Sequence, residues 1–130
     1  MKIRDLIGQK LERATFYQDP DFPAGEACKI VLDFASASLV ILPLEDTDEI
    51  ELKLFEEGVQ PEPGGDEILN ELVGTKLAAY WYCENHQGYF DQVLFGFHLM
   101  RPNFGVLSEA SALHLVDCGM ASERTEAAAT

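Results

Sequence analysis

The side chains of this 130-residue sequence best suited to catalysis or metal binding are three histidines and three cysteines. His86, His98 and His114 lie far apart along the chain and form no HxH or HExxH pair. Histidine chemistry would therefore require the fold to assemble a pocket from distant residues. One such alternative combines Asp91 with His98 and His114, and would make the protein a small enzyme or a metal-binding domain.

The cysteines, Cys28, Cys83 and Cys118, are odd in number, widely spaced and without a CxxC pair. This pattern argues against a disulfide framework and against a zinc site of four thiolates. Cys28 and Cys83 lie in apolar runs and are interpreted as small buried hydrophobic residues. Phosphate-binding loops and nucleophile motifs do not occur in the sequence either. We therefore predict no catalytic residue, no metal and no cofactor.

A run of acids at residues 45–49, EDTDE, has the ligand types that calcium prefers. The run does not follow the EF-hand pattern, and in a strand its successive side chains would point to opposite faces. We interpret it as an exposed turn that leads into a strand.

The acidity of the chain is regional. Its 9 Lys+Arg and 23 Asp+Glu give a formal net charge of −14. Residues 45–71 hold eleven acids and one base, and thus −10 of that charge. A concentrated negative field favours capture of a basic protein and disfavours nucleic acid and anionic membranes. The alternative is a solvated loop and strand edge that resists edge-to-edge pairing.

Residues 80–82, Tyr-Trp-Tyr, place two tyrosines on one face of a strand and Trp81 on the other. If Trp81 is buried, the tyrosines lie outward or against a helix, and exposed tyrosine rings beside acids would make good interface anchors. The alternative is a strand buried on both faces. The predicted partner-binding residues are Glu45, Asp46, Asp48, Glu49, Glu51, Tyr80 and Tyr82.

These residues are expected to lie on a β-rich scaffold. Two short helices are predicted at residues 3–6, ended by Gly8, and at 67–73, with Asp66 as N-cap and Gly74 as the stop. Residues 85–88 predict a hairpin turn. Alternating and β-branched runs predict eight strands, near residues 10–17, 29–34, 39–42, 49–54, 75–83, 89–97, 104–107 and 112–116.

An internal match indicates two similar halves. Residues 5–11, DLIGQKL, match residues 71–77, ELVGTKL, and similar strand-like runs follow each copy in the same order. We therefore predict a mostly antiparallel α+β fold of two αββββ-like repeats with pseudo-twofold symmetry. The repeats would form one sandwich or small barrel with two short helices.

The length fits a single domain over residues 1–120. Repeat 1 covers about residues 1–55, an acidic Pro/Gly linker 56–65, and repeat 2 about 66–118. Residues 121–130 are small and polar, and are predicted to be disordered. The sequence has no apolar run long enough for a membrane helix and no signal peptide at its start, so we expect a cytoplasmic protein.

Several segments resemble a small bacterial domain family of unknown function. They are residues 6–11, 32–34 and 46–50, and Asn85 with Gly88, Tyr89 and Asp91. This resemblance implies no activity. In size, charge and β-rich character the chain also resembles the acidic immunity proteins that neutralise bacterial toxins, and no residue role carries over from them.

The sequence leaves several functions open. The leading interpretation is a non-enzymatic protein-binding domain with a basic protein partner, of which a toxin-neutralising immunity protein is one form. The alternatives are the enzyme or metal-binding domain with a His/Asp pocket, and a phosphate-mimicking inhibitor of a nucleic-acid enzyme. The last requires carboxylates arrayed at phosphate-like spacing on a surface, and is weakened because some of the carboxylates lie in the predicted linker. A homodimer formed through a sheet edge is a further alternative.

Overall fold

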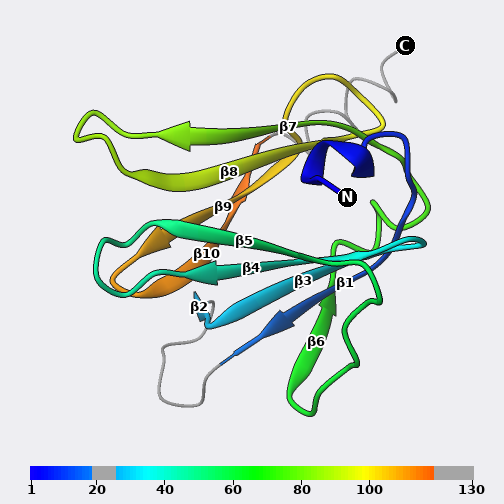
Figure 1. Cartoon of the computed structure of the whole chain (residues 1–130), viewed down its shortest axis with the longest axis horizontal. Helices are drawn as coiled ribbons and strands as arrows, with labels where there is room; N and C mark the ends of the chain where they lie inside the picture. The colour runs from blue at the N-terminus through cyan, green and yellow to red at the C-terminus, as the bar shows by residue number, and fades with distance from the viewer. Residues whose placement is uncertain (19–25, 119–130) are drawn as a thin grey trace.

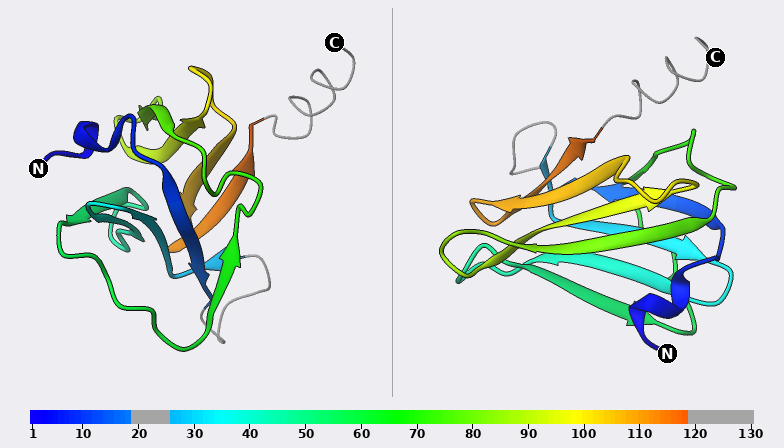
Figure 2. Two further views of the ribbon diagram at one scale, coloured as in Figure 1. Left: turned by 90° about the vertical axis from the view of Figure 1, so that its right-hand side faces the viewer. Right: turned by 90° about the horizontal axis from the view of Figure 1, so that it is seen from above.

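The computed structural model describes residues 1–18 and 26–118, which form two five-stranded antiparallel sheets (Figure 1). The first sheet has the strand order β5-β4-β3-β1-β6 and the second β2-β10-β9-β8-β7. Figure 2 shows these layers from the side and from above. The elements are η1 (Ile3–Leu6), β1 (Leu11–Tyr17), β2 (Glu26–Ala27), β3 (Lys29–Phe34), β4 (Ser38–Pro43), β5 (Ile50–Phe55), β6 (Gly65–Ile68), β7 (Leu77–Glu84), β8 (Phe90–Phe97), β9 (Phe104–Glu109) and β10 (Ala112–Asp117).

One hydrophobic core joins the two sheets. In the second sheet, Phe95 and Phe97 on β8 stack against Phe104 on β9, with ring centroids 5.1 and 5.8 Å apart. Phe34 on β3 reaches across from the first sheet and stacks on Phe97 at 6.3 Å. Burying each such ring stabilises the fold by about 1.5–3 kcal/mol, so these contacts hold the two layers together.

At one end of the sheets, the segments that lead into β1 and β7 lie side by side. The backbones of Lys10 and Lys76 form an isolated antiparallel β-bridge, which we call the lysine bridge. The two segments donate hydrogen bonds to each other in a reciprocal pattern, so each segment fixes the other. The donors and acceptors are Gly8 N to Leu77 O (2.8 Å), Gly74 N to Leu11 O (2.8 Å), Leu11 N to Thr75 O (2.9 Å) and Leu77 N to Gln9 O (3.0 Å).

Two glycines provide the backbone conformations that this pairing requires. Gly8 and Gly74 have φ values of 92° and 91°, in the left-handed region that other residues adopt only at a cost. No atom lies within 4 Å of a Cβ built at either position, so the requirement is conformational. The match between residues 5–11 and 71–77 therefore corresponds to two equivalent turns at this end of the molecule.

The predicted α+β fold of two αββββ-like repeats with two short helices is wrong. Residues 3–6 form one 3-10 turn, η1, and the first residues of the predicted second helix belong to strand β6. No α-helix occurs in the part of the chain that the structure describes. Strand β6 pairs with β1 from Gly65 opposite Tyr17 to Ile68 opposite Ala14, and Leu69 then turns away with a φ of 58°. A helix this short is stable only when packed, and the β1 edge provides a full set of backbone partners instead.

Each sheet also includes one edge strand from the other half of the chain. Strand β2 of the first half pairs with β10, with Ala27 opposite Leu113, and β6 of the second half extends the first sheet. The predicted disordered tail, residues 121–130, lies outside the described residues. Within the described ranges, no helix has the length and apolar character needed to cross a membrane.

Candidate functional site

The predicted acidic site is the turn between β4 and β5, residues 44–49, which we call the acidic turn. It lies at the end of the sheets away from the lysine bridge (Figure 1). The N–H of Leu44 donates to the carbonyl of Glu49 at 2.7 Å, and the N–H of Asp48 donates to that of Leu44 at 2.9 Å. Asp48 has a φ of 57°, a conformation that Asp tolerates better than most residues. These bonds give the turn a defined shape.

Two carboxylates of this turn accept hydrogen bonds from backbone N–H groups of the second sheet and its β9–β10 turn. Asp48 Oδ1 accepts the N–H of Ser111 at 2.9 Å, in the β9–β10 turn. Glu49 Oε2 accepts the N–H of Phe90 at 3.0 Å, and its other oxygen accepts the hydroxyl of Thr47 at 3.0 Å. A hydrogen bond to a charged acceptor contributes about 1.5–3 kcal/mol, so Asp48 and Glu49 have structural roles.

The remaining acids of the turn face solvent. Glu45 and Asp46 are exposed, and neither makes a hydrogen bond or ion pair within the described residues. Glu51, on β5, lies 3.4 Å from Lys53 on the same strand, and both side chains are partly exposed. Such an exposed pair contributes little to stability, so these carboxylates are available to a partner.

Tyr82 joins the acidic turn to strand β7. Its hydroxyl donates to the carbonyl of Ile50, and its ring stacks on Phe90 with centroids 4.9 Å apart. Partial burial raises the pKa of the Tyr82 phenol, and the carboxylates of Glu49 and Glu51 raise it further. The side chain stays 42% exposed, so it presents one ring surface beside the acids.

Tyr80 does not share this surface. It is half-buried and packs against the main core, whereas Trp81 on the opposite face of β7 is not part of that core. The tyrosines therefore face the first sheet, contrary to the expectation that a buried Trp81 turns them outward. The site includes Tyr82 because β7 is an edge strand and the ring lies near its end.

The β7–β8 hairpin carries a second aromatic ring. Asn85 Oδ1 accepts the N–H groups of Gln87 and Tyr89 at 2.8 and 3.2 Å, and its Nδ2 donates to Asp91 at 3.1 Å. An Asn side chain that closes a turn in this way fixes the hairpin geometry. Tyr89, which follows the turn of this hairpin, is 42% exposed.

The structure does not assemble the alternative pocket. Asp91 is the second residue of β8 and His98 follows its last residue, so about seven residues at roughly 3.3 Å each separate them. His114 lies on β10, where its Nε2 is 3.7 Å from Glu26 Oε1. Groups of three or more metal-ligating side chains do not occur in residues 1–18 and 26–118. The three residues therefore have no shared site.

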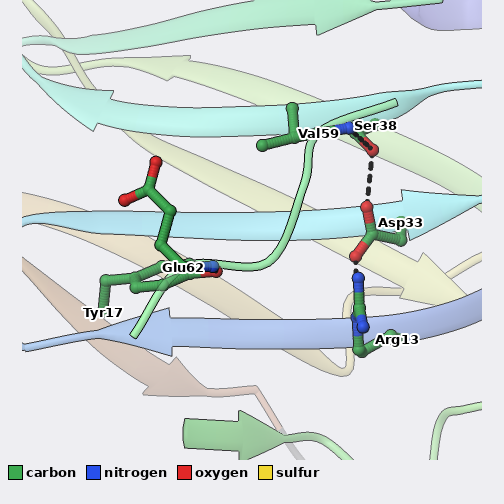
Figure 3. Close-up of polar contacts among 6 residues, drawn as sticks. All are labelled: Arg13, Tyr17, Asp33, Ser38, Val59 and Glu62. Atoms are coloured by element: carbon green, nitrogen blue, oxygen red, sulfur yellow. Dashed lines mark hydrogen bonds and ion pairs between the residues drawn. The ribbon is translucent and has the colours of Figure 1, made fainter. Parts of the chain in front are cut away.

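Three further acids of the acidic region, Glu56, Glu57 and Glu62, lie on the connection between β5 and β6, which crosses the outer face of the first sheet (Figures 2 and 3). Arg13 Nε pairs with Asp33 Oδ2 at 3.0 Å, and Ser38 donates its hydroxyl to Asp33 Oδ1. Ser38 Oγ also accepts the N–H of Val59 at 3.1 Å. This chain of contacts links β1, β3 and β4 to the connection. The sequence did not predict it.

A second set of contacts holds the same connection further along. The Tyr17 hydroxyl accepts the N–H of Glu62 at 3.2 Å, and Lys29 Nζ lies 3.1 Å from Glu62 Oε2. The same ammonium lies 4.6 Å from the centroid of the Tyr17 ring. Val59 packs beside Tyr17, Val31 and Val40. The connection thus covers an apolar part of the outer face that the sequence did not reveal.

The thiols are not activated. Burial raises the pKa of Cys83, and the Asp91 carboxylate adds to this effect. Burial also raises the pKa of Cys118, with further contributions from Asp117 and Cys83. Cys28 donates its S–H to the carbonyl of Tyr17 at 3.3 Å. A nucleophilic cysteine requires the opposite shift.

A family model described as a family of unknown function (DUF6334) matches residues 1–122. The chain belongs to this family. No curated protein matches the chain. No solved structure matches it either.

The DUF6334 membership covers every segment on which the resemblance was based, and the structure gives those segments structural roles. Residues 6–11 form one side of the lysine bridge, and Asp33 bonds Arg13 and Ser38. Residues 46–50 tie the acidic turn to the second sheet, and Asn85 closes the β7–β8 hairpin. These segments therefore stabilise the fold. A binding function would depend on the exposed side chains instead.

Proposed function

We propose that this protein is a non-enzymatic, cytosolic protein-binding domain that docks a basic segment of a partner on the acidic turn and the β7–β8 hairpin. The observation that carries the proposal is the position of Glu45 and Asp46. Both are exposed and unpaired within the described residues, in a turn whose neighbouring carboxylates fix it to the second sheet. The unpaired charges are thus presented on a rigid support.

Exposed aromatic and apolar groups lie on the turn itself and on β7 and the β7–β8 hairpin, which are hydrogen-bonded to the turn and to the start of β5. Tyr82 and Tyr89 are each 42% exposed, and Leu44 is 38% exposed at the start of the turn. An Arg or Lys side chain of a partner would stack on a tyrosine ring while its charge approaches a carboxylate. Because the turn and the hairpin are fixed by their own hydrogen bonds, little ordering entropy would oppose docking.

A basic toxin is one partner with the required chemistry, and toxin neutralisation is therefore the finer form of this proposal. Its support is the same acidic surface together with the net charge of −14. Electrostatic steering raises the association rate of such a pair and weakens with salt, because the Debye length falls from about 10 Å at 0.1 M to about 3 Å at 1 M.

The test begins with affinity capture from cells of the natural source, at low and high salt, to obtain the partner. Binding of the purified partner is then measured for the wild type, for Glu45→Gln/Asp46→Asn and for Tyr89→Ser. We expect the double variant to weaken binding about 2- to 30-fold, since each exposed charge contributes about 0.2–1 kcal/mol. The Tyr89 variant should weaken it as well.

The matched control is Glu12→Gln/Glu67→Gln, which removes two negative charges from exposed positions on β1 and β6. We expect this control to bind as the wild type does. Equal losses in both double variants would show that net charge alone matters, and unchanged binding in the first would refute the proposed site.

A further inference from the structure

The lysine bridge borders a cavity of about 530 Å³ at the end of the molecule opposite the acidic turn. Lys10, Lys76 and His98 line it together with apolar side chains, and none of the described residues that line it is acidic. The volume lies in the range of small-molecule sites. A basic hollow is unexpected in a chain whose net charge is −14.

The register places the side chains of Lys10 and Lys76 on the same face, and both residues line the cavity. The bonds from Leu11 N to Thr75 O and from Leu77 N to Gln9 O flank the Lys10/Lys76 pair, which is therefore a non-hydrogen-bonded antiparallel pair. The Cβ atoms of such a pair lie about 4.5–5.5 Å apart on the same face. Two like charges at this position repel each other unless an anion lies between them.

Neither lysine has an acidic partner to relieve this repulsion. Among the residues that the structure describes, Lys10 and Lys76 make no ion pair, and both side chains are exposed. Two other lysines are paired, Lys29 with Glu62 and Lys53 with Glu51. Within the described residues, Lys10 and Lys76 thus lie opposite each other with neither charge neutralised by an acidic side chain.

The opposite wall of the cavity is held firmly in place. The N–H of His98 donates to the carbonyl of Lys76 at 2.7 Å, and His98 has a φ of 73°. Behind it, Asn103 is 1% exposed and bonds both backbone groups of Phe97, at 3.1 and 2.8 Å. Met100, which is 74% exposed, adds an apolar surface at the rim.

We propose that this cavity binds a small organic phosphate monoester, with the phosphate between Lys10 and Lys76 and its organic group against Ile7 and Met100. A phosphate monoester carries about −1.5 to −2 charges near pH 7, which matches two ammonium groups. Lysine binds phosphate as a point charge and requires no bidentate geometry. The cavity is separate from the acidic turn, so this proposal is independent of the proposed function.

The test titrates ¹⁵N-labelled protein with phenyl phosphate, inorganic phosphate and benzoate, and follows amide shifts. We expect saturable shifts at residues 8–11, 74–77 and 98–100, with phenyl phosphate binding at least several-fold tighter than inorganic phosphate because of the apolar wall. Lys10→Gln/Lys76→Gln should weaken phenyl phosphate at least tenfold. The control Lys53→Gln changes a lysine on β5 and should bind as the wild type does.

Two further measurements keep the test decisive. The double variant removes a like-charge contact, so its melting temperature should equal or exceed that of the wild type, and lost binding would then not reflect unfolding. Met100→Ser should weaken phenyl phosphate and leave inorganic phosphate unchanged. The proposal is overturned if phosphate shifts are centred elsewhere, if the double variant binds as the wild type does, or if benzoate binds as tightly as phenyl phosphate.

Discussion

Asn103→Ala removes the side chain that holds the loop after β8 against the second sheet. Asn103 is 1% exposed; its Oδ1 accepts the N–H of Phe97 at 3.1 Å, and its Nδ2 donates to the Phe97 carbonyl at 2.8 Å. Phe97 itself is fully buried. The alanine variant therefore leaves one backbone donor and one backbone acceptor without partners in a place that water reaches poorly.

The cost follows from these two groups. An unsatisfied buried polar group costs about 1–3 kcal/mol, so two of them lower the free energy of unfolding by about 2–4 kcal/mol once some relaxation is allowed. For a domain of this size, that loss corresponds to a fall of about 10 °C in melting temperature. It is also a large part of the roughly 5–15 kcal/mol that stabilises a typical domain.

The assay is equilibrium urea denaturation together with thermal melting, with Ser108→Ala as the matched control. Ser108 is 3% exposed, and its hydroxyl has no hydrogen-bond partner within the described residues. Its removal should change stability by at most about 0.5 kcal/mol. A loss in Asn103→Ala within about 1 kcal/mol of that in the control would refute the reasoning.

Asn103→Asp separates hydrogen bonding from packing, because the shape is kept and the donor is lost. Burial would raise the pKa of the new carboxyl, and the charged form would face the Phe97 carbonyl. We therefore expect a large loss of stability at neutral pH, with partial recovery as the pH falls and the protonated carboxyl again donates. A loss independent of pH would contradict this account.

Three further predictions concern other parts of the molecule. The pKa of Tyr82 is raised above 10.0, so its contribution to stability is present below that pH and is lost as the pH rises through the raised value. Tyr82→Phe should reduce the alkaline loss of stability, and Glu51→Gln should shift the absorbance titration of this phenol to lower pH. Gly65→Ala places a Cβ 2.6 and 2.8 Å from side chains of β1, and should cost about 1–3 kcal/mol and increase protease cleavage in the β5–β6 connection. Asp48→Ala should cost about 1–3 kcal/mol in urea denaturation by removing the acceptor for Ser111 N, whereas Asp48→Asn, which keeps an acceptor and tolerates the left-handed φ, should cost less than half as much.

The strands could be predicted because their signal is local. Alternation over residues 49–54 and the β-branched or aromatic runs near 29–34 and 89–97 correspond to β5, β3 and β8. The turn at residues 85–88 could be predicted for the same reason, since the Asn85 side chain bonds backbone groups within four residues of it.

The second helix could not be excluded from the sequence. Ile68, Leu69 and Leu72 have helical spacing, and only pairing with β1, some fifty residues earlier in the chain, makes residues 65–68 a strand. The same limit applies to β2, which has two residues and exists because β10 offers an edge. Short segments take the conformation that their tertiary partners provide.

The candidate site shows the same division. The sequence places eleven acids within residues 45–71, and their charge alone predicts a basic partner. It does not show that Asp48 and Glu49 bond the other sheet, that Glu62 is paired with Lys29, or that Glu45 and Asp46 have no side-chain partner among the described residues. Whether a carboxylate is paired or unpaired depends on which backbone and side-chain groups the fold brings within hydrogen-bonding distance of it.

By itself, the sequence determined the β-rich character, the positions of eight of the ten strands and the regional charge, because each depends on composition or on neighbours within a few residues. Only the tertiary structure decided which strands pair, that the β5–β6 connection covers the first sheet, and that Lys10 and Lys76 meet over a cavity. The physical reason is that hydrogen bonds and charges act over a few ångströms, and residues 66 positions apart reach that distance only in the folded chain.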